Sequence, residues 1–352
     1  MRRGTTRFRM VRAWIGTGWL GVQLAVGATA GADTNAPGPE VIVVTGAAGE
    51  RAYGEMFASW AMRLKDAATR AEAAFTWIGQ GPSAGDGDRG LLQRTLTGRA
   101  KQSIEPLWLV LIGHGTYDGR TAKFNLRGAD VTAAELAEWL QGFRRPLAII
   151  NCTSASAPFI NRLKGEDRVI VTATKSGTEK NFARFGNYFT AGIADPGADL
   201  DKDGQTSLLE AFLMASKEAQ VFYGEKGRLA TEHALIDDNG DGFGSRADWF
   251  RGVRAVKKPA GKTEIDGFRA HQLHLVRSEL EKGLTPDERA ERDRLELALN
   301  RHRDRKARMT DEVYYSQLEK IVIQIARIYE RAEARRRESS SDSPKPAEEA
   351  AK

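Results

Sequence analysis

Cysteine is almost missing from this sequence, because Cys152 is the only one among 352 residues. A single thiol excludes an internal disulfide, so no disulfide framework holds this chain together. Long apolar runs are missing too. The most apolar stretch, "AWIGTGWLGVQLAVGATA", is interrupted by glycines, Thr17 and Gln23 and is short for a bilayer span. These two absences disfavour a disulfide scaffold and a membrane protein.

The first 32 residues have the pattern of a secretory signal peptide. The segment "MRRGTTRFRMVR" carries five arginines and no acid, the apolar stretch follows, and small residues then offer cleavage after Ala28-Thr29-Ala30 or Ala30-Gly31-Ala32. A single membrane anchor is the alternative. We expect export to the periplasm or the medium, with no membrane span left after cleavage.

Excess charge is also missing once this segment is removed. The rest of the chain has 48 basic and 47 acidic residues, so the formal net charge falls from +6 to +1. A nearly neutral chain has no strong electrostatic attraction to nucleic acid or to an anionic membrane. We therefore expect no nucleic-acid partner.

What the sequence does contain is an alternation of strand and helix patterns. Apolar and β-branched runs predict strands at residues 40–46, 73–79, 106–113, 146–151 and 168–174, and helical periodicity predicts helices at 50–71, 91–102 and 132–143. The runs at 106–113 and 146–151 are apolar at nearly every position, which is typical of strands buried on both faces of a parallel sheet. The order predicts an α/β domain over residues 33–258, with a mostly parallel sheet sandwiched by helices.

The C-terminal part of the chain changes character. Residues 259–338 are mostly helix formers and charged residues, with a helix start expected at Pro286. Their apolar residues recur at spacings of three, four or seven, at Leu295, Leu299, Leu318, Ile321, Ile325 and Ile328. This pattern predicts a helical hairpin or short coiled coil that docks on the sheet domain or supports self-association. Residues 339–352 have the composition of a disordered tail.

Reactive side chains follow two of the buried strands. His114 and Gly115 come directly after the run at 106–113, and Cys152 comes directly after the run at 146–151. Loops at the carboxyl ends of adjacent parallel strands line one crevice, so we expect the imidazole and the thiol to face each other. Imidazole can deprotonate a thiol and later protonate a leaving amine, while the N–H of Gly115 could hold an oxyanion. Structural roles for Cys152 and His114 are the alternative.

These residues carry a resemblance. A strand ending in His-Gly and a second strand ending in Cys152, 38 positions after His114, are similar to the caspase and legumain group of cysteine peptidases, clan CD, and look nearest to its bacterial legumain-like branch. The similarity covers residues 41–252. It implies a caspase-like fold with His114 as general base and acid, Cys152 as nucleophile and Gly115 as oxyanion donor.

The sequence around the nucleophile departs from the family pattern. Legumains typically have Ala-Cys, a small residue, Ser and Gly, whereas this chain has Asn151-Cys152-Thr153-Ser154-Ala155-Ser156. A catalytically inactive, caspase-like protein-binding module is therefore a second hypothesis. Ser154 or Ser156 would need stronger activation than a thiol to replace the nucleophile.

The resemblance implies a peptide or protein substrate, but the charge of the substrate pocket stays open. Asp118 or Glu179 would suit basic side chains, and Lys175 or Arg184 would suit acidic ones.

Two further expectations concern regulation and stability. Legumains are restrained by a C-terminal helical segment that lies over the active site, and by resemblance residues 263–337 could do the same. We also expect Cys152→Ser and His114→Ala each to abolish peptide hydrolysis and to leave the thermal midpoint nearly unchanged, because a nucleophile at a strand end contributes little packing.

An acidic loop, "DLDKDGQTSLLE", matches the calcium-loop pattern. Asp199, Asp201 and Asp203 alternate along it, Gln205 follows, and Glu210 stands at the twelfth position, so these five residues form a candidate calcium set. In the alternative reading, Ser207 and Glu210 form a capping box that opens the next helix.

A second acidic loop, residues 237–244, repeats half of this pattern without the closing glutamate. His233 is the only histidine near these loops in the sequence, so we expect at most a structural calcium and no metal for catalysis.

Overall fold

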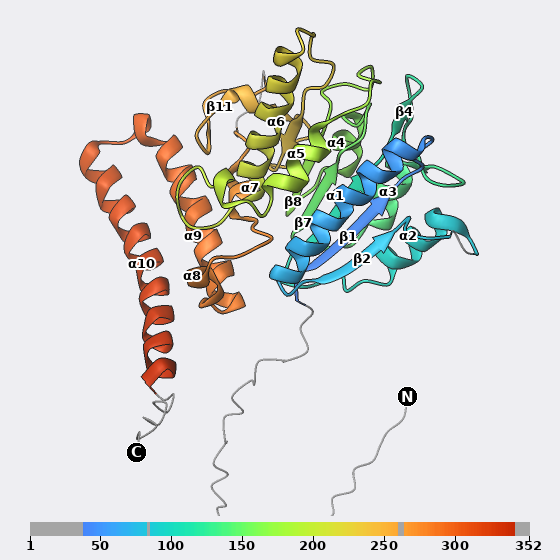
Figure 1. Cartoon of the computed structure of the whole chain (residues 1–352). Coiled ribbons are helices and arrows are strands. Elements are labelled where there is room, and N and C mark those ends of the chain that lie inside the picture. The colour runs from blue at the N-terminus through green and yellow to red at the C-terminus, as the bar shows by residue number, and fades with distance from the viewer. Residues whose placement is uncertain (1–37, 83–84, 260–263, 342–352) are drawn as a thin grey trace, which may run out of the picture. The chain divides into compact units, whose positions relative to one another are not determined.

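Figure 1 shows a computed structural model of the chain, which describes residues 38–82, 85–259 and 264–341. The expected signal peptide and most of the expected C-terminal tail lie outside the described residues. All described residues belong to the unit Pro37–Lys352. None of the helices in the described ranges is long and apolar enough to cross a membrane.

A seven-stranded sheet forms the centre of the α/β domain, with the strand order β10-β9-β8-β7-β3-β1-β2. Five neighbouring strands are parallel: β2 (Ala74–Ile78), β1 (Glu40–Thr45), β3 (Leu107–Ile112), β7 (Leu147–Asn151) and β8 (Arg168–Thr172). The strands β9 (Leu235–Asp237) and β10 (Ser245–Arg246) continue the sheet with antiparallel pairing. The predicted fold class, a mostly parallel sheet with helices, is confirmed.

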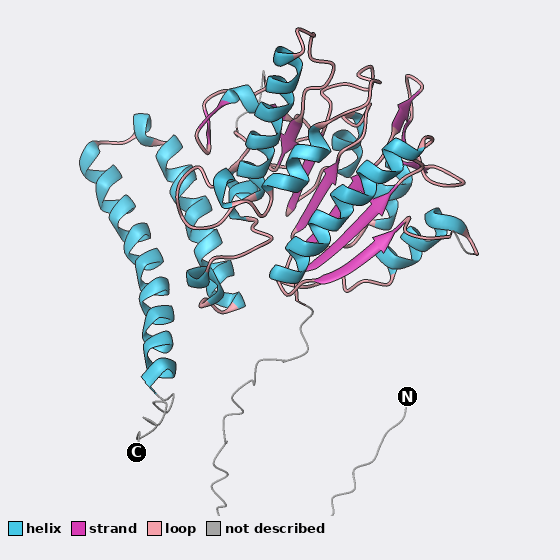
Figure 2. Ribbon diagram, viewed as in Figure 1, coloured by secondary structure: helices cyan, strands magenta, loops and turns pink. Residues whose placement is uncertain are grey.

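Helices cover both faces of this sheet (Figures 1 and 2). One face packs against α1 (Arg51–Arg70), α5 (Phe185–Gly192), α6 (Leu208–Glu225) and α7 (Phe268–Gln272), and the other against α2 (Gly87–Thr97), α3 (Ala133–Trp139) and α4 (Pro158–Leu163). Strand side chains alternate between the two cores, so that Val41 and Val43 lie on the α1 face and Ile42 and Val44 on the other. This alternation also sets the direction of the residues that follow each strand.

The polar stretch after β3 forms a small antiparallel sheet that the sequence reading missed. It consists of β4 (Gly115–Tyr117), β5 (Ala122–Phe124) and β6 (Val131–Thr132). Strands of two or three residues are too short to show an alternating pattern in the sequence. The remaining short elements are η1 (Pro196–Ala198), η2 (Ala247–Trp249), β11 (Phe250–Arg251), β12 (Arg254–Ala255) and η3 (Lys306–Arg308).

The expected helical hairpin is present at the C-terminal end of the described chain. It consists of α9 (Pro286–Asp304) and α10 (Asp311–Ser341), preceded by the short α8 (Glu279–Lys282). The two long helices are antiparallel, because Arg335 binds Glu288 at one end (2.5 Å) and His302 Nε2 lies 2.9 Å from the carbonyl oxygen of Tyr314 at the other. A small core of Leu284, Ile328 and Ala332 lies between them.

The hairpin is tied to the amino ends of the parallel strands. Arg277 and Arg289 both bind the carboxylate of Glu105, at 2.5 Å each, and Glu105 stands just before β3. Upstream of the hairpin, Ala270 and Leu275 lie in the core on the α1 face. The segment from α7 to Leu275 therefore packs with the α/β domain, although it follows the boundary expected near residue 259.

Candidate functional site

The catalytic candidates lie at the carboxyl ends of β3 and β7, which are adjacent and parallel. Cys152 directly follows β7, and its N–H donates to the carbonyl of Leu111 (2.9 Å). Cys152 continues the alternation of Ile150, and His114 continues that of Ile112, which both face α1. The structure thus brings the thiol and the imidazole to one edge and one face of the sheet.

Cys152 is buried, with 1% of its surface exposed. Gly186 of α5 packs directly against it and against Trp60 of α1: a Cβ atom on Gly186 would lie 2.8 Å from the Cβ of Cys152 and 2.6 Å from the Trp60 ring. Burial, with a contribution from the charge of Glu232, raises the pKa of the thiol far above its ordinary value. In this conformation the thiol is neutral and shielded from solvent.

His114 is half-buried in an aromatic surround. Its ring centroid lies 4.9 Å from that of Tyr53, 5.5 Å from Phe57 and 5.9 Å from Phe182, and Nε2 lies 3.2 Å from the carbonyl oxygen of Ala48. These aromatic residues were not predicted, since they belong to α1 and to the segment before α5.

The thiol and the imidazole lie at different positions along the strand direction. The last paired residues are Leu111 and Asn151, so Cys152 is level with Ile112, and His114 lies two residues further on, about 6 to 7 Å at the rise of a strand. Within the described ranges, no hydrogen bond joins the side chains of Cys152 and His114. The register therefore explains why the two groups share a face without a hydrogen bond between their side chains.

Gly115 connects the two strand ends directly. Its N–H donates to Ser154 Oγ (3.4 Å), and the same hydroxyl donates to the carbonyl of Gly115 (3.1 Å). A Cβ atom at Gly115 would lie 2.3 Å from the carbonyl oxygen of Ser154, so only glycine fits here. The predicted oxyanion donor is therefore engaged by the loop that carries the nucleophile.

The loop after Cys152 is a tight, buried turn. Ala155 has φ = +53°, in the region that favours glycine, at the position where the legumain pattern has glycine. Ser156 is fully buried, and its Oγ lies 3.1 Å from that of Thr174. Ser154 and Ser156 thus have structural hydrogen bonds.

The two acidic candidates for the substrate pocket differ in position. Asp118 is exposed in the turn between β4 and β5, where its carboxylate accepts the N–H groups of Thr121 (2.8 Å) and Arg120 (2.9 Å), which lower its pKa. Glu179 is mostly buried, and its carboxylate lies 2.5 Å from His233 Nδ1.

Glu179 also borders the nucleophile loop, because its main-chain carbonyl accepts the N–H of Ala155 (2.8 Å). The basic alternatives are less central: Lys175 Nζ lies 3.9 Å from Glu179, and Arg184 stacks on the Phe222 ring at 4.0 Å. Of the four candidates, the one with a backbone contact to the Cys152 loop is Glu179.

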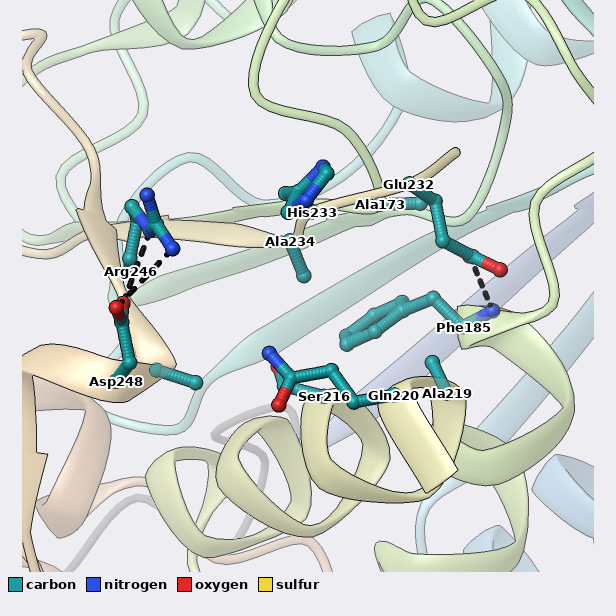
Figure 3. Close-up of a pocket in the computed structure, with 11 residues that line it drawn as sticks. Ala173, Phe185, Ser216, Ala219, Gln220, Glu232, His233, Ala234, Arg246 and Asp248 are labelled. Carbon is teal, nitrogen blue, oxygen red and sulfur yellow. Dashed lines mark hydrogen bonds and ion pairs between the residues drawn. The ribbon is translucent and has the colours of Figure 1, made fainter. Parts of the chain in front are cut away.

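Glu232 is a buried acid on the Cys152 side of the sheet that the sequence reading missed. Its carboxylate accepts the N–H groups of Arg184 (2.8 Å) and Phe185 (2.9 Å) at the start of α5, and desolvation raises its pKa. Figure 3 shows a pocket between Glu232, His233 and α6. Its volume is about 20 Å³. This volume holds about one water molecule and is too small for a peptide side chain.

The calcium-pattern loop is ordered by hydrogen bonds of its own. Ser207 and Glu210 form the capping box of α6, and the other oxygen of Glu210 accepts the N–H of Leu200 (2.7 Å). Gln205 Nε2 donates to Asp203 (3.1 Å), and burial raises the pKa of Asp203. The helix-cap alternative is therefore present in the structure, and calcium binding stays a prediction.

The carboxylates of this loop nevertheless converge. Oxygens of Asp199, Asp201 and Asp203 lie within 4.8 Å of one another, and so do atoms of Asp201, Glu210 and His271. The second acidic loop repeats the same turn: Asp237 accepts the N–H groups of residues 240 and 242, as Asp199 does those of residues 202 and 204.

Solved structures similar to this one include the Drosophila initiator caspase Dronc, at 15% identity and a TM-score of 0.39, over 59% of this chain and 81% of that chain. Caspase-1 from Spodoptera frugiperda is similar at 8% identity and a TM-score of 0.36, over 58% of this chain and 87% of that chain. Protein GSU0716 from Geobacter sulfurreducens is similar at 11% identity and a TM-score of 0.36, over 59% and 98% of the two chains. Similarity at this level carries no argument about activity. No protein-family profile and no curated protein sequence matches the chain.

Proposed function

We propose that this chain is an exported cysteine endopeptidase of the caspase and legumain type, nearest to the bacterial legumain-like branch. The observation that carries the proposal is the arrangement of two neighbouring parallel strands. Their carboxyl ends present His114-Gly115 and Cys152 on one face, and Ser154 joins the two ends by hydrogen bonds to Gly115.

Catalysis from this arrangement requires the start of α5 to move. Displacing Gly186 from Cys152 would expose the thiol, remove its desolvation and lower its pKa. His114 then takes the thiol proton, the thiolate attacks the substrate carbonyl carbon, and the leaving amine receives that proton. Water then hydrolyses the thioester and restores the thiol. The N–H of Gly115, released from Ser154, stabilises the oxyanion, and Glu179, whose backbone contacts the Cys152 loop, is the acidic candidate for the substrate pocket.

The second candidate function is a catalytically inactive, protein-binding module. The burial of Cys152 favours it, since a thiol that is 1% exposed and lacks a bond to His114 is inert as it stands. In that case the aromatic residues around His114 serve only to pack α1 against the sheet.

Labelling separates the two candidates. A peptidyl acyloxymethyl ketone, which must be activated by a catalytic dyad, is incubated with the folded protein, and modification of Cys152 is followed by intact mass. The peptidase proposal predicts labelling that slows at least tenfold in His114→Ala and is unchanged in His302→Ala, a buried histidine of the hairpin. Equal rates in all three proteins, or labelling only after denaturation, would leave the inactive module as the better description.

A further inference from the structure

Helix α10 carries more apolar surface than α9 covers. Figure 1 shows α10 beside α9 and on the side away from the α/β domain. The residues that face α9 recur at spacings of three and four and are all buried or half-buried: Tyr314, Leu318, Ile321, Ile325, Ile328 and Ala332. Other apolar residues of α10 are open to solvent, since Tyr315 is 53%, Val322 47% and Ile323 42% exposed. A single neighbouring helix therefore does not account for the apolar side chains of α10.

A second group of apolar residues lies next to the stripe that faces α9. We call this group the outer face of α10, and it consists of Tyr315, Val322, Ala326 and Tyr329. Tyr329 is half-buried, and the other three residues are exposed. At 3.6 residues per turn, the outer face is centred about 90° from the centre of the stripe, and the two together span about 160°. This apolar sector is wider than the stripe of about 100° with which a surface helix typically faces its core.

Helix formation does not explain the exposed apolar residues of α10. Valine and tyrosine have a lower helix propensity than alanine, glutamate, lysine and arginine, which fill most exposed positions of α9 and α10. In the part of the chain that the structure describes, four of the thirteen exposed large hydrophobic residues lie in α10 and none lies in α9. An exposed apolar patch rimmed by charged residues is typical of a surface that binds another protein.

The charges of α10 are unevenly distributed along the helix. Residues 311–325 contain three acidic residues and one lysine, a net charge of −2, whereas residues 326–338 contain five arginines and three glutamates, a net charge of +2. The acidic pair at 311–312 and the basic pair at 336–337 both lie on the side of the outer face. A second α10 in the antiparallel direction brings opposite charges together at both ends, whereas a parallel one brings like charges together. The charge pattern therefore favours an antiparallel copy of the same helix.

We propose that two copies of this chain form a symmetric dimer through the outer faces of α10, with the two helices antiparallel. A two-fold axis near residue 324 places Val322 of each copy next to Ala326 of the other. The same axis places the acidic pair 311–312 of each copy near the basic pair 336–337 of the other. The two hairpins then form a four-helix bundle. The dimer uses no residue of the candidate catalytic site, so it does not depend on the peptidase proposal.

The test is the mass of the full-length chain in solution, measured by sedimentation equilibrium over a range of concentrations. We expect the parent to form a dimer and Val322→Glu to raise its dissociation constant at least about a hundredfold, because each copy then brings an unpaired carboxylate into the apolar interface. Val313→Glu is the matched control. Val313 is 46% exposed on the same helix, and nine residues from Val322 it points to the opposite side. This variant should dimerise within about threefold of the parent. Both valines are exposed, so circular dichroism should show the helix content of the parent in both variants.

Charge reversal tests the direction of pairing. In an antiparallel dimer, Asp311→Arg with Glu312→Arg brings basic groups together at both ends of the interface and should raise the dissociation constant at least about tenfold. Adding Arg336→Glu and Arg337→Glu restores opposite charges and should return dimerisation to within about threefold of the parent. A parallel dimer would not respond to the first change, because like charges meet before and after it.

Three results would overturn the proposal. The first is a parent chain that stays monomeric at about 0.1 mM. The second is dimerisation that Val322→Glu and Val313→Glu affect equally, because the interface would then lie elsewhere. The third is a dimer that the reversal at residues 311 and 312 leaves unchanged, because the two helices would then not be antiparallel.

Discussion

Replacing Cys152 by serine tests directly whether the thiol is desolvated. The structure contradicts the premise that a nucleophile at a strand end contributes little packing, since Cys152 is 1% exposed and packs against Gly186. A serine hydroxyl in this place loses its water without an evident partner, which costs about 1 to 3 kcal/mol. For a domain of this size, each kcal/mol lowers the melting temperature by about 2 to 4 °C. We expect Cys152→Ser to melt about 2 to 12 °C below the parent.

Cys152→Ala is the matched comparison. Alanine leaves a small void but introduces no polar atom, so we expect the serine variant to be less stable than the alanine variant, although serine is closer to cysteine in size. Calorimetry or melting by circular dichroism measures the order. If Cys152→Ser melts within about 1 °C of the parent and above Cys152→Ala, the thiol is solvated in solution and the closed arrangement over it is refuted.

Three further predictions concern other parts of the molecule. Burial and the charge of Asp238 raise the pKa of Asp266 to about 8, so the stability that its protonation provides is present below its ordinary pKa and is lost as the pH rises towards 8. The free energy of unfolding, measured with urea, should therefore fall as the pH rises from about 4 to about 8, and Asp266→Asn should make this dependence weaker. If the free energy falls equally steeply with pH in both proteins, the pKa of Asp266 is not raised. Arg292→Met should leave the buried carboxylate of Glu281 unpaired, lower the free energy of unfolding by about 3 to 5 kcal/mol and speed amide exchange in α8–α10. Arg51→Ala, which breaks an exposed ion pair, should lower it by less than about 1 kcal/mol. Equal amide exchange in Arg292→Met and the parent would show that the buried pair does not hold the hairpin. Truncation after residue 278 should leave the labelling of Cys152 unchanged, because the ion pair of Arg289, in the hairpin, with Glu105 lies at the opposite edge of the sheet; faster labelling would support a lid.

The elements that the sequence predicts well are those whose signal is local. The segments that form β1, β3 and β7 are mostly apolar in the sequence. This pattern, together with the rule for parallel strand ends, predicts that Cys152 and His114 lie at one edge of the sheet. The depth of Cys152 was not predictable in the same way. It depends on Trp60 and Gly186, which come from helices far away in the chain.

The same distinction applies to the acidic loop. Its carboxylates and its capping box are visible in twelve consecutive residues, and the capping box is present in the structure. His271 and His274 give no local signal, because only the folding of α7 onto the sheet brings them to Asp201 and Asp203. His233, which is nearer in sequence to the acidic loops, binds Glu179 instead.

The burial of Cys152 also affects how long the thiol survives. If the chain is exported as proposed, it enters a compartment where an exposed thiolate is oxidised to sulfenic acid and beyond, and Cys152 has no second cysteine to reduce or protect it. A neutral, buried thiol that packs against Gly186 is inaccessible to oxidants as well as to substrates. Any movement of α5 that exposes the nucleophile to substrate therefore also exposes it to oxidation. The number of turnovers of one molecule would then be limited by the total time that α5 spends displaced from Cys152.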